Sequence, residues 1–144
     1  LYVVTAADGD ELAAATINWL TQASFQPPLV VAGLKDDSHT KELVERTGRF
    51  AVNVLGEDQL EIGSAFFRPL VQEDELINGY RFERGPITGA PLLEDTAYWF
   101  EAQVLDAVAR GDHTVFVAQV VGAGVRDDAV APLNLRSTGM SYGG

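Results

Sequence analysis

Cysteine is absent from the 144-residue sequence, and its absence excludes several kinds of chemistry. Without a thiol, the chain forms no disulfide, uses no thiolate nucleophile and holds no cysteine-ligated metal or iron–sulfur cluster. Histidine is also scarce, because His39 and His113 are the only two. Neither has a partner at the spacing of a metal site, so we expect no bound metal.

The sequence also lacks long hydrophobic runs and has few basic residues. No apolar stretch approaches the ~20 residues of a membrane-spanning helix, and no secretory signal pattern opens the chain. Ten basic residues against 21 acidic ones give a net charge of −11. That charge disfavours binding to nucleic acid or to an anionic membrane. The missing cysteine fits a cytoplasmic protein.

The length and composition predict one domain, residues 1–144, with a core of its own. Hydrophobic residues make up 47% of the chain and charged residues 22%, which is ordinary for a globular protein. Residues 1–5 already have the pattern of a strand. We therefore expect the natural chain to begin before Leu1.

Strand patterns dominate the sequence. Short apolar runs bounded by turn residues, and two long runs that partly alternate, predict β-strands. The runs on either side of the turns at 7–10 and 110–112 predict two hairpins. The predicted strands cover Leu1–Thr5, Leu12–Thr16, Leu29–Leu34, Phe50–Leu55, Tyr98–Val108 and Thr114–Val125. Many strands with few helices favour a closed or nearly closed β-barrel.

Two helices interrupt this pattern. Residues 38–47 begin with Ser38, carry apolar side chains on one face and end before Gly48, a typical C-terminal stop. Residues 57–67 begin with acidic side chains, which stabilise a helix N-terminus. Residues 68–84 are polar and poorly periodic, so we expect a loop over one end of the barrel, with at most a helical turn.

The segment from Gly33 to Thr40 has the features of an anion site. It runs from an apolar strand directly into a helix start, and it carries the Lys35 ammonium and the Ser38 and Thr40 hydroxyls. Backbone N–H groups, charged donors and the helix dipole act together on a phosphate. The alternative is that Ser38 or Asp37 only caps the helix, which is the commoner use of such residues.

Residues 14–24 offer a place for a flat ring. Small side chains allow a ring to lie close to the backbone, and Thr16, Asn18 and Ser24 supply hydrogen-bonding groups. The alternative is a strand followed by a polar connection, with Trp19 in the core. Taken alone, this second interpretation is favoured.

His113 follows a tight turn and begins a predicted strand on the rim of the barrel. There its ring can hydrogen-bond to a ligand, stack on it or move a proton near neutral pH. The alternative is a turn or surface histidine. Neither Ser24 nor Ser38 has a recognisable base and orienting acid, which argues against a hydrolase, and no G-x-G-x-x-G fingerprint follows a strand.

In their order and spacing, these segments resemble the flavin reductase-like family, whose members fold as an FMN-binding split β-barrel. The resemblance covers nearly the whole chain and depends on seven short segments. They are residues 3–5, 15–18, 24–30, 35–40, 48–55, 89–93 and 111–117.

The resemblance implies a mainly β fold, a split β-barrel with two or three short helices, and a set of flavin contacts. Ser38 and Thr40, with Lys35 and His39 beside them, would surround the flavin phosphate. The ribityl chain and ring would be lined, largely through backbone groups, by Ala15, Thr16, Ile17, Asn18 and Ser24. His113 would be the catalytic histidine near the flavin face where a nicotinamide docks.

For function, the resemblance implies a homodimeric NAD(P)H:flavin reductase that uses FMN or FAD. Electrons would pass from NADH or NADPH to the flavin and, in some relatives, on to a separate monooxygenase. A flavoredoxin-like electron-transfer protein is the second hypothesis. It is motivated by Trp19, which replaces a serine-rich stretch of the reductases, and by the acidic excess, which can steer a basic partner. A barrel of the pyridoxamine phosphate oxidase type is the third.

Three further positions bear on this comparison. Asn53 matches the family, but in an apolar strand we expect its amide to satisfy backbone groups of the barrel. Ala102 stands where many relatives carry a cysteine, as a variation of the core. Residues 139–144 resemble the family's terminal Tyr-Gly element.

Overall fold

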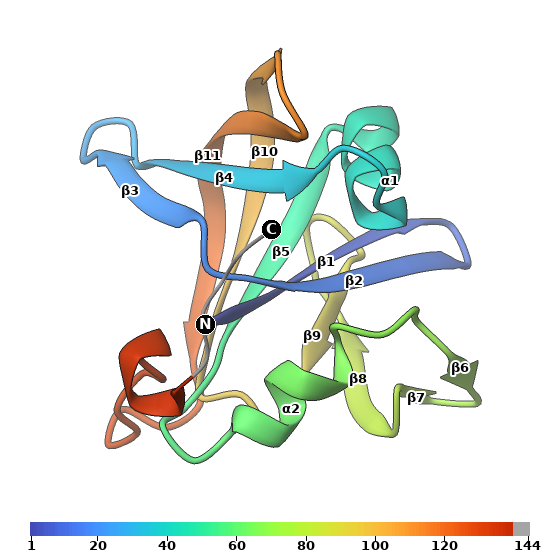
Figure 1. Ribbon diagram of the computed structural model, residues 1–144, viewed down its shortest axis with the longest axis vertical. Coiled ribbons are helices and arrows are strands. Elements are labelled where there is room, and N and C mark those ends of the chain that lie inside the picture. Colours follow the sequence, from blue (N-terminus) through green and yellow to red (C-terminus); the bar gives the residue numbers. More distant parts are fainter. Residues whose placement is uncertain (140–144) are drawn as a thin grey trace.

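The computed structural model describes residues 1–139 and consists mainly of β-strands (Figure 1). One antiparallel sheet contains β1 (Tyr2–Asp8), β2 (Glu11–Ile17), β3 (Leu20–Ser24), β4 (Leu29–Lys35), β5 (Arg49–Val54), β10 (Tyr98–Ala109) and β11 (His113–Val125). A smaller sheet contains β6 (Gln72–Glu73), β7 (Leu76–Ile77), β8 (Tyr80–Arg84) and β9 (Pro91–Leu93). The helices are α1 (His39–Thr47), α2 (Leu60–Ala65) and the short 3-10 helix η1 (Leu135–Thr138).

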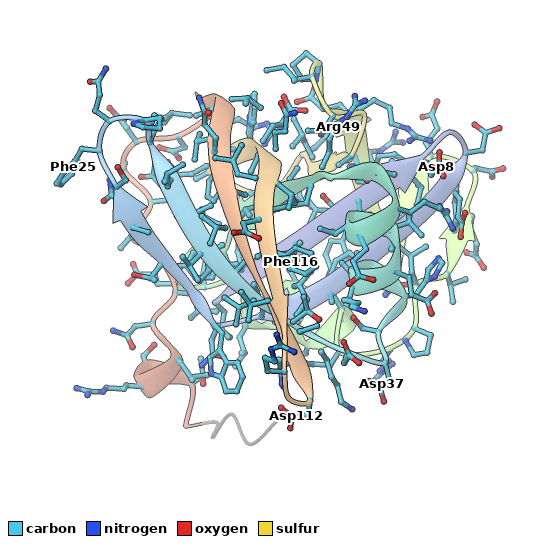
Figure 2. The ribbon with its side chains drawn as sticks, turned by 90° about the horizontal axis from the view of Figure 1, so that it is seen from above. Asp8, Phe25, Asp37, Arg49, Asp112 and Phe116 are labelled. Carbon is cyan, nitrogen blue, oxygen red and sulfur yellow. The ribbon has the colours of Figure 1, made fainter. Side chains whose placement is uncertain are left out.

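The large sheet curls around a hydrophobic core (Figure 1). Its strand order is β2-β1-β5-β10-β11-β4-β3, so β2 and β3 are its two edges. Phe50 and Phe116 fill the interior together with Leu43 and Val44 of α1, and Figure 2 shows Phe116 in the middle of the molecule. The mainly β fold is confirmed. Within the described residues no strand ladder joins β2 to β3, so the sheet is not closed into a full barrel.

β1 is buried on both of its faces. Val4 packs into the core inside the curled sheet, whereas its neighbour Val3 packs into a second cluster on the outside. That second cluster contains Ile62 of α2, Ile77 of β7 and Leu93 of β9. Successive strand residues point to opposite faces, so an unbroken apolar run such as β1 serves two cores at once.

α1 forms where the sequence predicts it. Ser38 is the N-cap, with its side chain accepting from Lys41 N, and Gly48 ends the helix at φ 68°. A left-handed residue of this kind is accessible to glycine at little cost, which explains the stop. Among residues 1–139, no helix is both long and apolar enough to cross a membrane.

The prediction of a loop at residues 68–84 was wrong. This segment contributes β6, β7 and β8 to the smaller sheet, which β9 completes. Tyr80 and Phe82 of β8 pack on the second core, while the turn before β8 uses Asn78 and Gly79 at positive φ. Strands of two residues are too short to show an alternating pattern, which is why the sequence did not reveal them. α2 is also shorter than the predicted 57–67.

Asn53 satisfies backbone groups, as predicted. Its amide nitrogen donates to Val3 O at 3.3 Å and to Pro91 O at 3.2 Å. Its oxygen accepts from Leu93 N at 2.7 Å. The side chain therefore ties β1, β5 and β9 together and is not free to contact a ligand. Ala102 is fully buried in the main core.

Candidate functional site

Three segments from distant parts of the chain meet at one end of the large sheet. Lys35, the last residue of β4, is the cross-strand partner of His113, the first residue of β11. The turn after Lys35 leads directly into α1. The connection of β2 to β3 lies beside them, because Gly33 N donates to Trp19 O at 2.9 Å. Figure 2 shows Asp37 and Asp112 at this end, at the bottom of the view.

His113 is held on two sides. Its side chain is only 5% exposed, and its Nδ1 lies 2.9 Å from Oδ1 of Asp112, which is 90% exposed. The ring of Trp19 lies against the imidazole, with 4.4 Å between the ring centroids. Trp19 also covers Gly33, where an added Cβ would lie 3.2 Å from the indole. With 47% of its surface exposed, Trp19 is not the core residue of the second interpretation.

Two buried polar atoms at this end have no hydrogen-bond partner within residues 1–139. They are Asn18 Oδ1 and His113 Nε2. A buried polar atom without a partner costs about 1–3 kcal/mol, so such atoms are rare unless a ligand or water uses them. The two belong to neighbouring parts of the site, because Asn18 precedes the Trp19 that contacts His113. These two atoms make this end of the sheet the candidate site.

Several polar side chains of the turn between β4 and α1 already have partners within the protein. Ser38 Oγ donates to Lys35 O at 2.7 Å and accepts from Lys41 N at 3.2 Å. The Lys35 ammonium is exposed and lies 3.5 Å from Asp37, and Thr40 is buried. The capping interpretation of Ser38 is thus confirmed. Contact of Ser38, Thr40 and Lys35 with a phosphate stays a prediction.

A carboxylate that the sequence did not single out anchors this turn. Asp36 accepts from Thr114 Oγ1 at 2.9 Å and lies 3.2 Å from Lys41 Nζ, which also contacts Glu45 at 2.9 Å. The Thr114 hydrogen bond, followed by Lys41, lowers the pKa of Asp36 below its ordinary value. Asp36 N donates to Asp112 O at 2.9 Å. The spacing of Lys41 and Glu45 is a helical signal, but no local signal links Asp36 to a strand so far along the chain.

The residues of β2 that were predicted to contact the flavin make contacts that hold the fold together. Thr16 Oγ1 donates to Gly63 O at 2.7 Å, and Thr16 N donates to Phe66 O at 3.2 Å. Ile17 is buried in the main core, and Ala15 pairs with Val4 of β1. Asn18, which follows this segment, is the member whose side-chain oxygen has no hydrogen-bond partner within the described residues.

The contacts of His39 and Ser24 do not include His113. The His39 ring contacts carboxylates, with Nε2 3.2 Å from Glu11 and Nδ1 3.4 Å from Glu42. Ser24 pairs with Leu29, at the far end of the β3–β4 hairpin. β4 has seven residues, so roughly 20 Å of strand separates that end from Lys35. Figure 2 shows Phe25, next to Ser24, at the opposite edge of the molecule.

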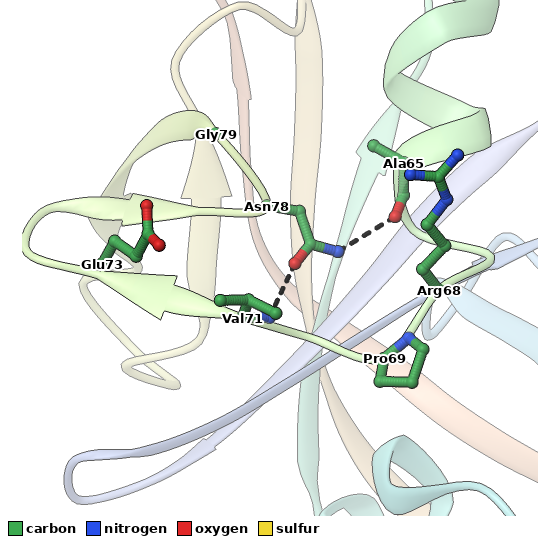
Figure 3. Close-up of a pocket in the computed structure, with 7 residues that line it drawn as sticks. All are labelled: Ala65, Arg68, Pro69, Val71, Glu73, Asn78 and Gly79. Atoms are coloured by element: carbon green, nitrogen blue, oxygen red, sulfur yellow. Dashed lines mark hydrogen bonds between the residues drawn. The ribbon is translucent and has the colours of Figure 1, made fainter.

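A separate pocket of about 480 Å³ lies between α2 and the turn before β8 (Figure 3). It is lined by Ala65, Arg68, Pro69, Val71, Glu73, Asn78 and Gly79. The Asn78 amide is occupied there, because it donates to Ala65 O at 2.9 Å and accepts from Val71 N at 2.7 Å. None of the predicted site residues lines this pocket.

Comparison with known proteins identifies the family. The model of the flavin reductase like domain matches residues 1–143. The chain belongs to this family. It is 37% identical over 129 residues to the NADH-dependent flavin reductase StyB of Pseudomonas fluorescens, covering 90% of the chain and 72% of StyB. It is 28% identical over 144 residues to the putative diflavin flavoprotein A 6 of a Nostoc species, covering 99% of the chain but 25% of that protein.

Solved structures share the fold. The NADH:FAD oxidoreductase SgcE6 of Streptomyces globisporus, in complex with NAD and FAD fragments, superposes with a TM-score of 0.78 at 26% identity, over 91% of this chain and 76% of that one. The styrene monooxygenase flavin reductase SMOB of Pseudomonas putida S12 gives a TM-score of 0.71 at 29% identity, over 88% of this chain and 80% of that one. A mainly β flavin reductase fold is therefore confirmed.

Proposed function

We propose that this protein is a flavin-dependent oxidoreductase that transfers electrons from NADH or NADPH to a flavin. One observation carries the proposal. The unpartnered buried atoms of Asn18 and His113 lie at the sheet end where β4 leads into α1. The family resemblance implies a flavin ring near Asn18 and His113 and a phosphate at the β4–α1 turn, and these unpartnered atoms support that proposal.

The chemistry of these residues fits a flavin. A flavin ring edge carries both N–H and C=O groups, and Asn18 Oδ1 is an acceptor suited to such an N–H. The exposed Lys35 ammonium and the start of α1 provide positive potential for a phosphate. When bound, the flavin supplies the hydride acceptor and passes the electrons on, while the protein supplies placement and polarity. His113 and Trp19 would form the wall against which the ring and a nicotinamide are aligned.

We propose FMN as the flavin, with FAD as the second choice. A single phosphate at the β4–α1 turn is enough to hold FMN, which is why we place it first. The names of StyB and SgcE6 support NADH as donor. The name of SMOB supports a monooxygenase as acceptor of reduced flavin. Because NADH is a cytoplasmic cofactor, we propose the cytoplasm as the compartment.

We also propose that the protein is a homodimer. Leu105 and Val108 on β10 and Val115 on β11 are large exposed hydrophobic residues. Val108 and Val115 are cross-strand partners, so they share one face of the sheet. Adjacent apolar side chains on a sheet are suited to an isologous contact with a second copy.

Electron transfer between proteins is the second candidate. The Trp19 ring against His113 narrows the space for a nicotinamide, and the match to a diflavin flavoprotein fits a flavin domain fed by another domain. In that case the flavin would be reduced by a protein and not by NADH.

Anaerobic reduction tests the proposal. We expect the purified protein to bind added FMN, and NADH or NADPH to bleach the visible absorbance of the bound oxidised flavin. Bleaching at a catalytic rate contradicts the electron-transfer candidate. Flavin binding without bleaching by either nicotinamide favours it, and no binding of FMN or FAD contradicts both.

A further inference from the structure

We propose that Asn78 is a modification site, where the side-chain amide converts spontaneously to a carboxylate, and that this conversion loosens the contact between the end of α2 and the turn before β8. The proposal concerns the smaller sheet and does not depend on the flavin. Asn78 and Gly79 form the turn between β7 and β8. Asn78 also lines the pocket shown in Figure 3.

The turn between β7 and β8 requires a chemically reactive pair of residues. Asn78 has a φ of 49° and Gly79 a φ of 88°. Two-residue hairpin turns favour Asn followed by Gly, because these residues adopt positive φ at the least cost. Asparagine is thermolabile, and it is most so before glycine, which has no side chain to shield its backbone nitrogen. The other three asparagines, Asn18, Asn53 and Asn134, precede the larger residues Trp, Val and Leu.

The conversion of Asn78 needs only water as a reactant. The backbone nitrogen of Gly79 attacks Cγ of Asn78 and forms a C–N bond, and the side-chain nitrogen leaves as ammonia together with the proton of Gly79 N. Water then opens the cyclic imide at one of its two carbonyl carbons. Opening on one side gives aspartate. Opening on the other side gives isoaspartate, in which the main chain is one carbon longer.

The fold holds the Asn78 amide at both of its ends. Nδ2 donates to Ala65 O at 2.9 Å, and Oδ1 accepts from Val71 N at 2.7 Å (Figure 3). This orientation of the amide follows from its partners, because a carbonyl can only accept and a backbone N–H can only donate. The side-chain nitrogen must leave Ala65 O before it departs as ammonia. We therefore expect the reaction to proceed from the fraction of molecules in which this contact is open.

Neither product can restore the contact. A carboxylate only accepts, so in aspartate an oxygen would face Ala65 O where the N–H had been. Ala65 is the last residue of α2, and the C-terminus of a helix carries partial negative charge, which disfavours a carboxylate there. Isoaspartate lengthens a two-residue turn and disturbs the pairing of Ile77 with Tyr80. Both products therefore weaken the attachment of α2 to the β7–β8 hairpin and alter the pocket between them.

Ageing of the purified protein at mildly alkaline pH, followed by peptide mass spectrometry, tests the modification. We expect the mass change of an amide-to-acid conversion at Asn78 in the folded protein, while the other three asparagines keep their amides. In the chain unfolded by urea, we expect Asn78 to convert at least about tenfold faster, because the restraint on the amide is gone. Equal rates in the folded and unfolded chains would overturn the proposal. So would a folded protein that converts first at another asparagine or does not convert at all.

The variant Asn78→Asp tests the consequence without ageing. We expect faster hydrogen exchange of the backbone N–H at position 78, which donates to Val71 O in the wild-type protein, and of the N–H groups in the last turn of α2. Asn134→Asp is the matched control. There the side-chain oxygen accepts from Arg136 N, and a carboxylate can do the same, so exchange at position 78 should not change. Unchanged exchange at position 78 and in α2 of N78D would contradict the role of the Asn78 amide.

Discussion

Ser38 has two uses that compete for one hydroxyl. It caps α1 by accepting from Lys41 N and donates to Lys35 O. A phosphate at the same turn would need the Ser38 proton or the neighbouring N–H groups. A simple Ser38→Ala change cannot separate these uses, because losing an N-cap alone costs about 1 kcal/mol.

The Ser38→Asp substitution separates helix capping from phosphate binding. Aspartate caps a helix about as well as serine, so we expect the free energy of unfolding to stay within ~0.5 kcal/mol of wild type. Its charge would repel a phosphate, so we expect flavin affinity to fall at least tenfold, or ~1.4 kcal/mol. Urea unfolding and a fluorescence titration with FMN measure the two quantities. Unchanged affinity would mean that the phosphate binds elsewhere.

At the scale of elements, α1 is attached to the sheet by charge as well as by its apolar face. Asp36 joins Thr114 of β11 to Lys41 of α1, and Arg46 at the other end contacts Asp8 and Glu11 of the β1–β2 hairpin. Exposed ion pairs contribute little individually. The role of Asp36 is to set the position of the turn that opens the candidate site.

The attachment of α1 through Asp36 predicts that the stability of the folded chain depends on pH. The pKa of Asp36 is lowered from 3.8 in the folded chain, so the unfolded chain takes up its proton first as the pH falls. The stabilisation is present above the ordinary pKa and is lost as the pH falls through the lowered one. We expect the stability difference between wild type and Asp36→Asn, from urea unfolding, to shrink as the pH falls below the ordinary pKa of 3.8. Asp10→Asn, on the β1–β2 turn, is the surface control. A difference independent of pH would contradict this account of Asp36.

At the scale of the whole molecule, a large acidic excess coexists with a few exposed apolar residues on β10 and β11. The net charge of −11 keeps molecules apart in general. The exposed side chains of Val108 and Val115 are cross-strand neighbours on β10 and β11, and Leu105 is exposed on the same strand as Val108. A second copy that covered this face would also approach His113, two residues before Val115.

The homodimer makes a testable prediction. We expect the wild-type chain to sediment with about twice its mass of 15.5 kDa, and Val115→Asp to sediment as a monomer, because a buried unpaired charge costs several kcal/mol at an interface. Val125→Asp, at the other end of β11, is exposed as well and should leave the dimer intact. A monomeric wild type, or a dimer unaffected by V115D, would contradict the proposed interface.

Much of this molecule could be predicted from local signals. The β1–β2 hairpin, α1 with its two caps and the long β10–β11 pair each have turn or cap residues at fixed spacing. The smaller sheet could not be predicted because its two-residue strands, β6 and β7, are too short to show an alternating pattern. The Asp112–His113 contact joins neighbours in sequence, yet nothing local shows that the ring is buried under Trp19. Ser24 illustrates the opposite error, since a short distance along the sequence became a long one once β3 and β4 formed an extended hairpin.

The open edges of the large sheet have a consequence for its motions. Within the described residues, β2 and β3 each have one side without a neighbouring strand, and Asn18 and Trp19 connect them. Edge strands open more readily than central ones, and their amide hydrogens exchange with water sooner. A molecule held between Asn18 and His113 would tie the connection between the two edge strands to β11, an interior strand, and would slow the exchange of amide hydrogens at that connection. The opening of the sheet and the occupancy of the site are therefore parts of one equilibrium.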